Sequence, residues 1–139
     1  MLPFFWKWDA ELPSHVLAAV EAEMDAAVLE SAQVFAAPEY AVREAEVALR
    51  PGWHWLAGVL GNDAVWANEQ ARWGYTLGKP DAVQFTRYGP GGHYHWHTDT
   101  LLMSAAAQTR KISVVCLLSS PEDYEGGDLS PSRRPCGTG

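Results

Sequence analysis

The most informative stretch of the sequence is Gln84-Phe-Thr-Arg-Tyr-Gly-Pro-Gly-Gly-His-Tyr-His-Trp-His-Thr-Asp99. Alternating polar and apolar side chains predict a strand over residues 83–88, and the glycines and proline of residues 89–92 predict a turn. A further strand is predicted over residues 93–98. Alternate side chains of a strand share one face. The side chains expected together on one face are His93, His95, His97 and Asp99.

Imidazole and carboxylate groups together suit a divalent metal such as iron. Side chains two residues apart on a strand are separated by about 6.6 Å, and metal–ligand bonds of about 2 Å allow both to reach one ion. His95 and Asp99 would be about 13 Å apart and would need a kink to do so. The chain has one His-x-Asp pair, His97-Thr-Asp99, and we predict that it binds metal. For His93 and His95 we favour packing on the strand surface or the turn.

Two helices are predicted before these strands. Residues 14–34 carry apolar side chains at every fourth position and predict the first helix, and residues 53–68 predict the second. The interval 36–52 contains two prolines and a charged stretch, so it is predicted to be mostly loop with a short strand. Alternation over residues 73–77 predicts another strand.

The segment after Asp99 predicts one further strand. Residues 101–109 indicate a connection of small residues, and residues 119–127 a loop. Between them, residues 110–118 are apolar on both faces, which is typical of a central strand covered on both sides. Because the helices come first and the strands follow, the sequence predicts an α+β fold with a β core.

Composition narrows the possible functions. The chain has 139 residues, 47% of them hydrophobic, a formal net charge of −7 and a pI near 5.1. One domain is expected, and the acidic balance disfavours binding to nucleic acid. Apolar runs are too short to span a bilayer, and the first nine residues do not resemble a signal peptide. Cys116 and Cys136 do not indicate a disulfide framework, so we expect a cytoplasmic protein without a nucleic-acid or membrane partner.

The pattern Tyr88-x-x-Gly91-x-x-Tyr94-x-x-His97-x-Asp99 resembles the metal-site signature of Fe(II)- and 2-oxoglutarate-dependent oxygenases of the prolyl-4-hydroxylase-like (PKHD-type) family. Residues 110–118, followed by Tyr124-Glu-Gly-Gly-Asp-Leu129, resemble the next strand and turn of that family. The likeness extends over roughly residues 10–129.

This resemblance implies a double-stranded β-helix (a cupin-like jelly roll) with N-terminal helices packed on it. It implies Fe(II) and 2-oxoglutarate, with ascorbate as a further possible cofactor, and His97 and Asp99 as two of three iron ligands. Tyr88 becomes the candidate for binding 2-oxoglutarate, with Arg110 and Lys111 as secondary candidates. Tyr94 is expected in the barrel wall. The implied reaction hydroxylates a prolyl or other aliphatic C–H centre of a peptidyl or small-molecule substrate and converts 2-oxoglutarate to succinate.

The chain departs from the family pattern after Asp99. No histidine follows it, whereas the family has a second histidine and a basic anchor on later strands. We therefore expect an incomplete oxygenase domain over residues 1–129, with its β-helix open at the C-terminus, and an aberrant or disordered tail over residues 130–139. Two alternatives remain open. One is a non-catalytic remnant or binding module, and the other is a cupin-like metal protein in which His95 or His93 is an additional ligand.

Overall fold

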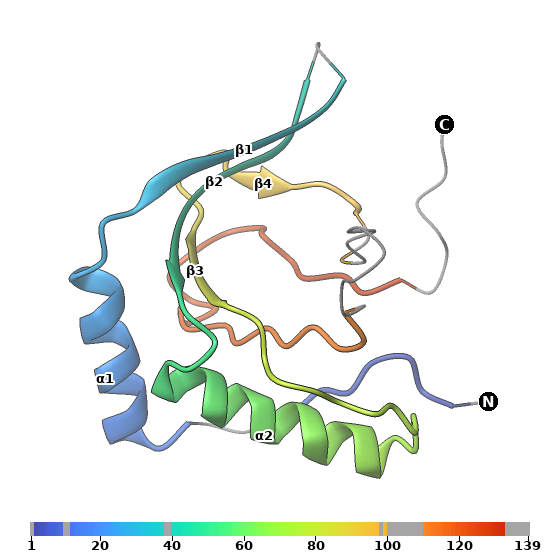
Figure 1. Cartoon of the computed structure of the whole chain (residues 1–139). Coiled ribbons are helices and arrows are strands. Elements are labelled where there is room, and N and C mark those ends of the chain that lie inside the picture. Colours follow the sequence, from blue (N-terminus) through green and yellow to red (C-terminus); the bar gives the residue numbers. More distant parts are fainter. Residues whose placement is uncertain (1, 10–11, 38–39, 98, 100–109, 133–139) are drawn as a thin grey trace.

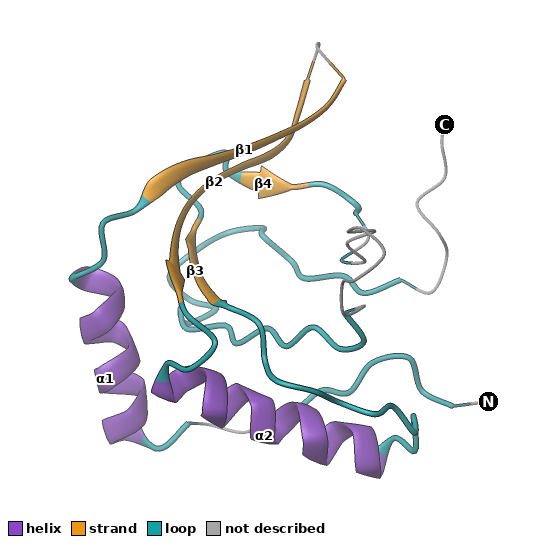
Figure 2. Ribbon diagram, viewed as in Figure 1, coloured by secondary structure: helices purple, strands orange, loops and turns teal. Residues whose placement is uncertain are grey.

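The computed structural model describes residues 2–9, 12–37, 40–97, 99 and 110–132. Within these residues, two helices and a four-stranded antiparallel sheet form the fold (Figure 2), so the α+β class is confirmed. In chain order the elements are α1 (Ser14–Asp25), β1 (Glu30–Ala37), β2 (Tyr40–Arg50), α2 (Trp55–Gln70), β3 (Val83–Arg87) and β4 (His93–Tyr94).

Strand β2 organises the sheet. Strand β1 pairs along one edge of β2. Strands β3 and β4 pair with the other edge, with Val47 opposite Thr86 and Arg43 opposite Tyr94. β3 and β4 therefore follow one another along the same edge, joined by the turn at residues 88–92 (Figure 1). This arrangement brings the chain to the beginning of the His97–Asp99 segment.

The hydrophobic core lies between the helices and one face of the sheet. Val20 of α1 and Leu56 of α2 form a buried cluster with two sheet residues, Ala48 and Phe85. These two are register partners and therefore share a face. By the alternation of strands, Arg43 and Thr86 belong to the opposite face.

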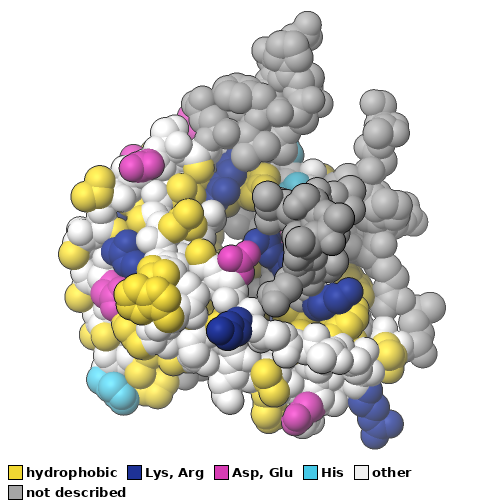
Figure 3. All heavy atoms as spheres, in the orientation of Figure 1, with side chains coloured by type: hydrophobic (Ala, Val, Ile, Leu, Met, Phe, Trp, Pro, Cys, Tyr) yellow, Lys and Arg dark blue, Asp and Glu magenta, His cyan; other side chains and the backbone are white. Residues whose placement is uncertain are grey.

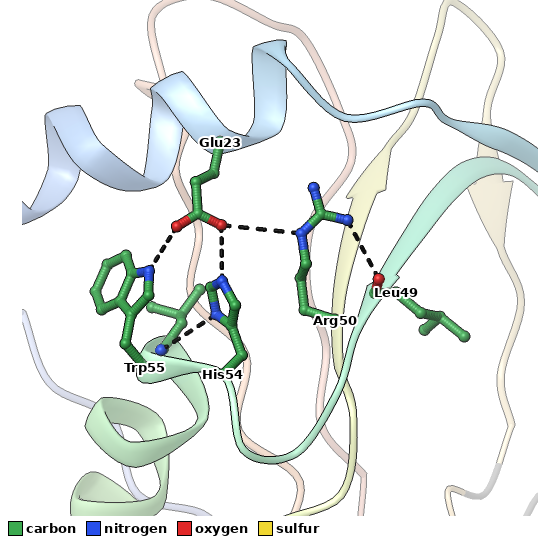
Figure 4. Close-up of polar contacts among 6 residues, drawn as sticks. Glu23, Leu49, Arg50, His54 and Trp55 are labelled. Carbon is green, nitrogen blue, oxygen red and sulfur yellow. Dashed lines mark hydrogen bonds and ion pairs between the residues drawn. The ribbon is translucent and has the colours of Figure 1, made fainter.

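A cluster of polar side chains connects α1, the end of β2 and the start of α2 (Figure 4). The Glu23 carboxylate accepts a hydrogen bond from Trp55 Nε1 at 2.5 Å and one from His54 Nε2 at 2.9 Å. His54 Nδ1 accepts the backbone N–H of Leu56 at 3.3 Å and thereby caps α2. His54 consequently carries its proton on Nε2.

The N-terminal half contains more sheet than predicted. Helix α1 ends at Asp25 rather than at residue 34, and Val28 is 84% exposed beyond it. The prediction of mostly loop with a short strand over residues 36–52 is wrong, because the long strand β2 occupies 11 of these positions. Alanine and glutamate have low strand propensity, but the hairpin with β1 satisfies the backbone of β2, and Ala45 and Ala48 are buried.

No strand forms over residues 73–77, contrary to prediction. The side chain of Asn68 takes the place of a strand partner there. Its Nδ2 donates to the carbonyl of Tyr75 at 2.9 Å, and its Oδ1 accepts the N–H of Tyr75 at 3.0 Å. Both backbone groups are thus satisfied by a helix side chain.

The segment 110–118 is not the covered central strand that was predicted. Side-chain exposure alternates only over residues 111–115. Leu118 lies against the core, whereas Val115 and Leu117 are 58% and 65% exposed and Cys116 between them is exposed as well. A strand requires a hydrogen-bonded neighbour, and none of the described strands pairs with this segment. Burial raises the pKa of the Cys116 thiol here, and the Asp63 carboxylate raises it further. The predicted connection at residues 101–109 and most of the predicted tail lie outside the described residues.

Figure 3 shows one face of the molecule, where hydrophobic side chains are interspersed with separate basic and acidic groups. Several large apolar side chains are exposed, including Trp53 at 86%. Within the described part of the chain, neither helix is long and apolar enough to cross a membrane.

Candidate metal centre

The turn between β3 and β4 determines where the candidate site lies. Gly91 has a φ of +80°, which residues other than glycine rarely adopt. A Cβ atom on Gly92 would lie 2.8 Å from the carbonyl oxygen of Gly89 and 3.2 Å from that of Glu44. Glycine therefore allows the turn to press against β2 and directs the chain into β4.

His97 is held in one orientation by its own backbone neighbour. Its Nδ1 lies 2.7 Å from the carbonyl oxygen of His95. Since a carbonyl only accepts, Nδ1 donates to it, and in the neutral ring Nε2 then carries the lone pair. Metal-binding histidines characteristically donate their second ring N–H in this way.

Asp99 faces that lone pair. Its Oδ1 lies 3.2 Å from His97 Nε2. Two ligands bonded to one ion at about 2.1 Å and at right angles would have donor atoms about 3 Å apart, so the pair fits adjacent positions on a divalent metal. Two facing acceptor atoms repel unless a cation or a proton lies between them. Both side chains are partly exposed, at 34% and 46%.

The strand carrying these residues is shorter than predicted, and Tyr94 differs from expectation as a result. β4 ends at Tyr94, and the chain bends at Trp96. The rings of Tyr94 and His97 are therefore not on opposite faces but stacked, with centroids 3.5 Å apart and planes inclined by 8°. On its own strand pair, Tyr94 is opposite Arg43, whose guanidinium carbon lies 4.8 Å from the centroid of the tyrosine ring.

The other two histidines of this stretch lie together. The rings of His93 and His95 have centroids 4.6 Å apart, and His93 Nδ1 lies 3.1 Å from the carbonyl of Gly91 in the turn. Among the residues that the structure describes, no group of three His, Cys, Asp or Glu side chains is placed to hold a metal ion.

The candidate residues for binding 2-oxoglutarate are placed differently from one another. Arg110 lies beside the metal pair, since its guanidinium is 3.5 Å from the Asp99 carbonyl and 3.3 Å from the Asp81 carboxylate. Tyr88 directly follows β3, is 48% exposed and, by alternation, shares the face of Thr86. Lys111 is exposed.

Sequence reasoning missed two residues near the site. Arg43 lies in a segment predicted as loop, so nothing indicated that it would face β4. Asp81 directly precedes β3, and its contact with Arg110 joins positions far apart in the sequence. A basic side chain at the start of an apolar segment marked Arg110 as a candidate, but it gave no indication that Asp81 would be its partner.

One family model matches part of the chain. Residues 83–135 match the model of the 2OG-Fe(II) oxygenase superfamily. This segment, which includes His97 and Asp99, is therefore similar to that superfamily, whose name refers to Fe(II) and 2-oxoglutarate. A histidine and a carboxylate at the observed separation are suitable donors for that metal.

The related proteins indicate a particular type of oxygenase. The chain is 47% identical over 49 residues to a PKHD-type hydroxylase of Crocosphaera subtropica, covering 34% of this chain and 22% of that protein. A PKHD-type hydroxylase of Stenotrophomonas maltophilia is 45% identical over 49 residues, covering 33% and 22%. The predicted likeness to this type of oxygenase is confirmed, although the aligned part spans only about a fifth of each relative. No solved structure matches the chain.

Proposed function

We propose that this chain provides part of the active site of an Fe(II)- and 2-oxoglutarate-dependent dioxygenase that hydroxylates a prolyl or other aliphatic C–H centre. The supporting observation is the His97 Nε2 to Asp99 Oδ1 distance of 3.2 Å, within the segment that matches the superfamily. We also propose that the antiparallel sheet is part of a double-stranded β-helix.

Fe(II), when bound, would allow O₂ to oxidise both 2-oxoglutarate and the substrate, so that one oxygen atom enters succinate, the other enters the hydroxyl group, and CO₂ is released. His97 and Asp99 would hold the metal by two adjacent positions. The carbonyl of His95 would keep the proton of His97 on Nδ1, so that Nε2 stays available as a ligand.

Tyr88, Arg110 and Lys111 are proposed to bind the 2-oxoglutarate co-substrate. Arg110 is the best placed of them, because its guanidinium already contacts the backbone of Asp99. To bind a carboxylate of the co-substrate, Arg110 would give up or share its contact with Asp81. The side chain of Asp81 is exposed, so it can turn to solvent. An arginine fork binds carboxylates in a bidentate manner.

Anaerobic titration of the chain with Fe(II) tests the metal site. We expect one Fe(II) per chain, with affinity falling at least about 10-fold in His97→Gln and in Asp99→Asn. His15→Gln, at an exposed position of α1, is the matched control and should bind as the unaltered chain does. Equal affinity in all four proteins would contradict the assignment.

Turnover is tested separately by succinate formation from 2-oxoglutarate in air. Metal-dependent succinate that is lost in Asp99→Asn would support the oxygenase. Metal binding without succinate would instead favour the non-catalytic binding module.

A further inference from the structure

The side chains of Arg43, Tyr94 and His97 lie one against the next, starting at the sheet. Arg43 on β2 is the register partner of Tyr94 on β4, and its guanidinium carbon is 4.8 Å from the centroid of the tyrosine ring. The same ring is stacked on His97 at 3.5 Å with nearly parallel planes. A contact path thus connects a central strand with the candidate metal ligand.

Arg43 is buried to an unusual degree for a charged residue. Only 8% of it is exposed, and within the described part of the chain its Nε has no hydrogen-bond partner. One Nη donates to Thr86 Oγ1 at a long 3.5 Å. A buried cation whose Nε lacks a partner among the described residues is costly, and the π face of Tyr94 offers it electrostatic compensation.

The backbone alone holds this region weakly. Among the described residues, β4 is joined to the sheet through the two pairs Arg43–Tyr94 and Glu44–His93, and the chain leaves the strand directly afterwards. The hydrogen bond from His97 Nδ1 to the His95 carbonyl fixes one direction in the imidazole plane. It leaves the ring free to tilt about that bond, and a stacked neighbour removes this freedom.

We propose that Arg43 and Tyr94 are positioning residues for His97. They hold its ring plane so that Nε2 faces Asp99 before any metal binds, which lowers the cost of ordering the ligand when the metal arrives. This inference rests on the proposed function, because it takes His97 as a metal ligand. It assigns to Tyr94 a role through His97, and to Arg43 a role through Tyr94.

Metal affinity of the full chain gives the first test, with Co(II) as the probe and its visible absorption spectrum as the signal. We expect Tyr94→Leu to weaken binding about 10-fold or more, as is usual for groups that orient a ligand. Tyr94→Phe keeps the ring and should stay within about 3-fold. Arg43→Met should weaken binding by a smaller factor, and the double variant Arg43→Met/Tyr94→Leu should bind no worse than Tyr94→Leu alone.

Arg50→Met is the matched control. Arg50 lies on the same strand, and its guanidinium carbon is 5.5 Å from the ring centroid of Phe85, so the change removes a comparable cation–π contact on the other face of the sheet. It should leave Co(II) affinity unchanged. A loss equal to that of Arg43→Met would show a general effect on the fold and would overturn the inference.

The second test needs no metal. The stacked tyrosine ring should shift the ring-proton NMR signals of His97 upfield, and these signals are assigned by their absence in His97→Gln. The shift should persist in Tyr94→Phe and disappear in Tyr94→Leu, or in Tyr94→Met should the leucine variant not fold. Unchanged signals in the folded variant would overturn the stack itself.

The two tests separate the possible failures. Co(II) binding by the unaltered chain together with unchanged affinity in Tyr94→Leu would overturn the positioning role and leave the proposed function standing. Absence of Co(II) binding by the unaltered chain would overturn the proposed function, and the positioning role with it, even where the NMR shift confirms the stack.

Discussion

Gly92 is the residue on which the close contact between the turn and β2 depends. Any side chain there would meet backbone atoms of both Gly89 and Glu44, and backbone cannot move aside as a flexible side chain can. The position of β4, and with it that of His97, follows from this contact. Substitutions at different glycines of this turn should therefore differ widely in their cost to stability.

We predict that Gly92→Ala lowers the free energy of unfolding by about 1–3 kcal/mol, the usual cost of overpacking, and also weakens metal binding. Gly89→Ala is the matched control, since a Cβ there meets nothing within 4 Å and no positive φ is recorded for it. Urea denaturation of both variants provides the measurement. Equal losses would show that the close approach is not what matters.

Cys116 is the residue whose ionisation should affect stability. Burial, and then Asp63, raise its pKa in the folded chain, so folding favours the protonated thiol. This contribution is fully present below the ordinary thiol pKa of about 8.5 and is lost as the pH rises through the raised pKa. Between pH 8 and 10, Cys116→Ser should lose stability less steeply than the unaltered chain in urea denaturation. Parallel slopes would refute this.

Among the elements, those with strong local signals were predictable. β3 shows the polar–apolar alternation of a strand, and the turn after it contains glycines that allow positive φ. The apolar residues of α2 recur with helical periodicity. β1 and β2 do not, because alanine and glutamate dominate β2 and only the long-range pairing makes it a strand. The 73–77 segment fails for the converse reason, since Asn68 satisfies its backbone from α2.

The same distinction holds for the candidate site. His97 and Asp99 are two residues apart, so their proximity was predictable from the sequence. Their confirmed closeness does not depend on the long strand that was expected. Arg43 and Asp81 were not predictable, because each reaches the site region through a partner distant in sequence.

Helix α2 provides a prediction at the level of elements. His54→Ala removes both the cap on Leu56 and the contact with Glu23, and should cost about 0.5–2 kcal/mol of unfolding free energy. His54→Asn keeps a side-chain acceptor for the cap and should cost less. Thermal unfolding of the two variants tests this, and an equal cost would mean that the cap contributes nothing.

At the scale of the whole molecule, the segment 110–118 leaves apolar side chains in solvent. Val115 and Leu117 are both more than half exposed, and exposed apolar surface favours association. We predict that the chain self-associates with rising concentration, and that Val115→Thr/Leu117→Thr reduces the average mass in sedimentation equilibrium. Leu49→Thr, at a position 62% exposed on β2, is the control. An equal reduction of the average mass by Leu49→Thr would show that the segment 110–118 is not the surface that associates.

The placement of β4 also has a kinetic consequence. β1 and β2 are neighbours in sequence and form a hairpin, whereas β4 must reach β2 from across α2 and β3. Closing the longer loop costs more chain entropy, so the hairpin should form before β4 docks. Metal ions present during refolding would then leave the early phases unchanged and act only on the last one, in which His97 and Asp99 come into place.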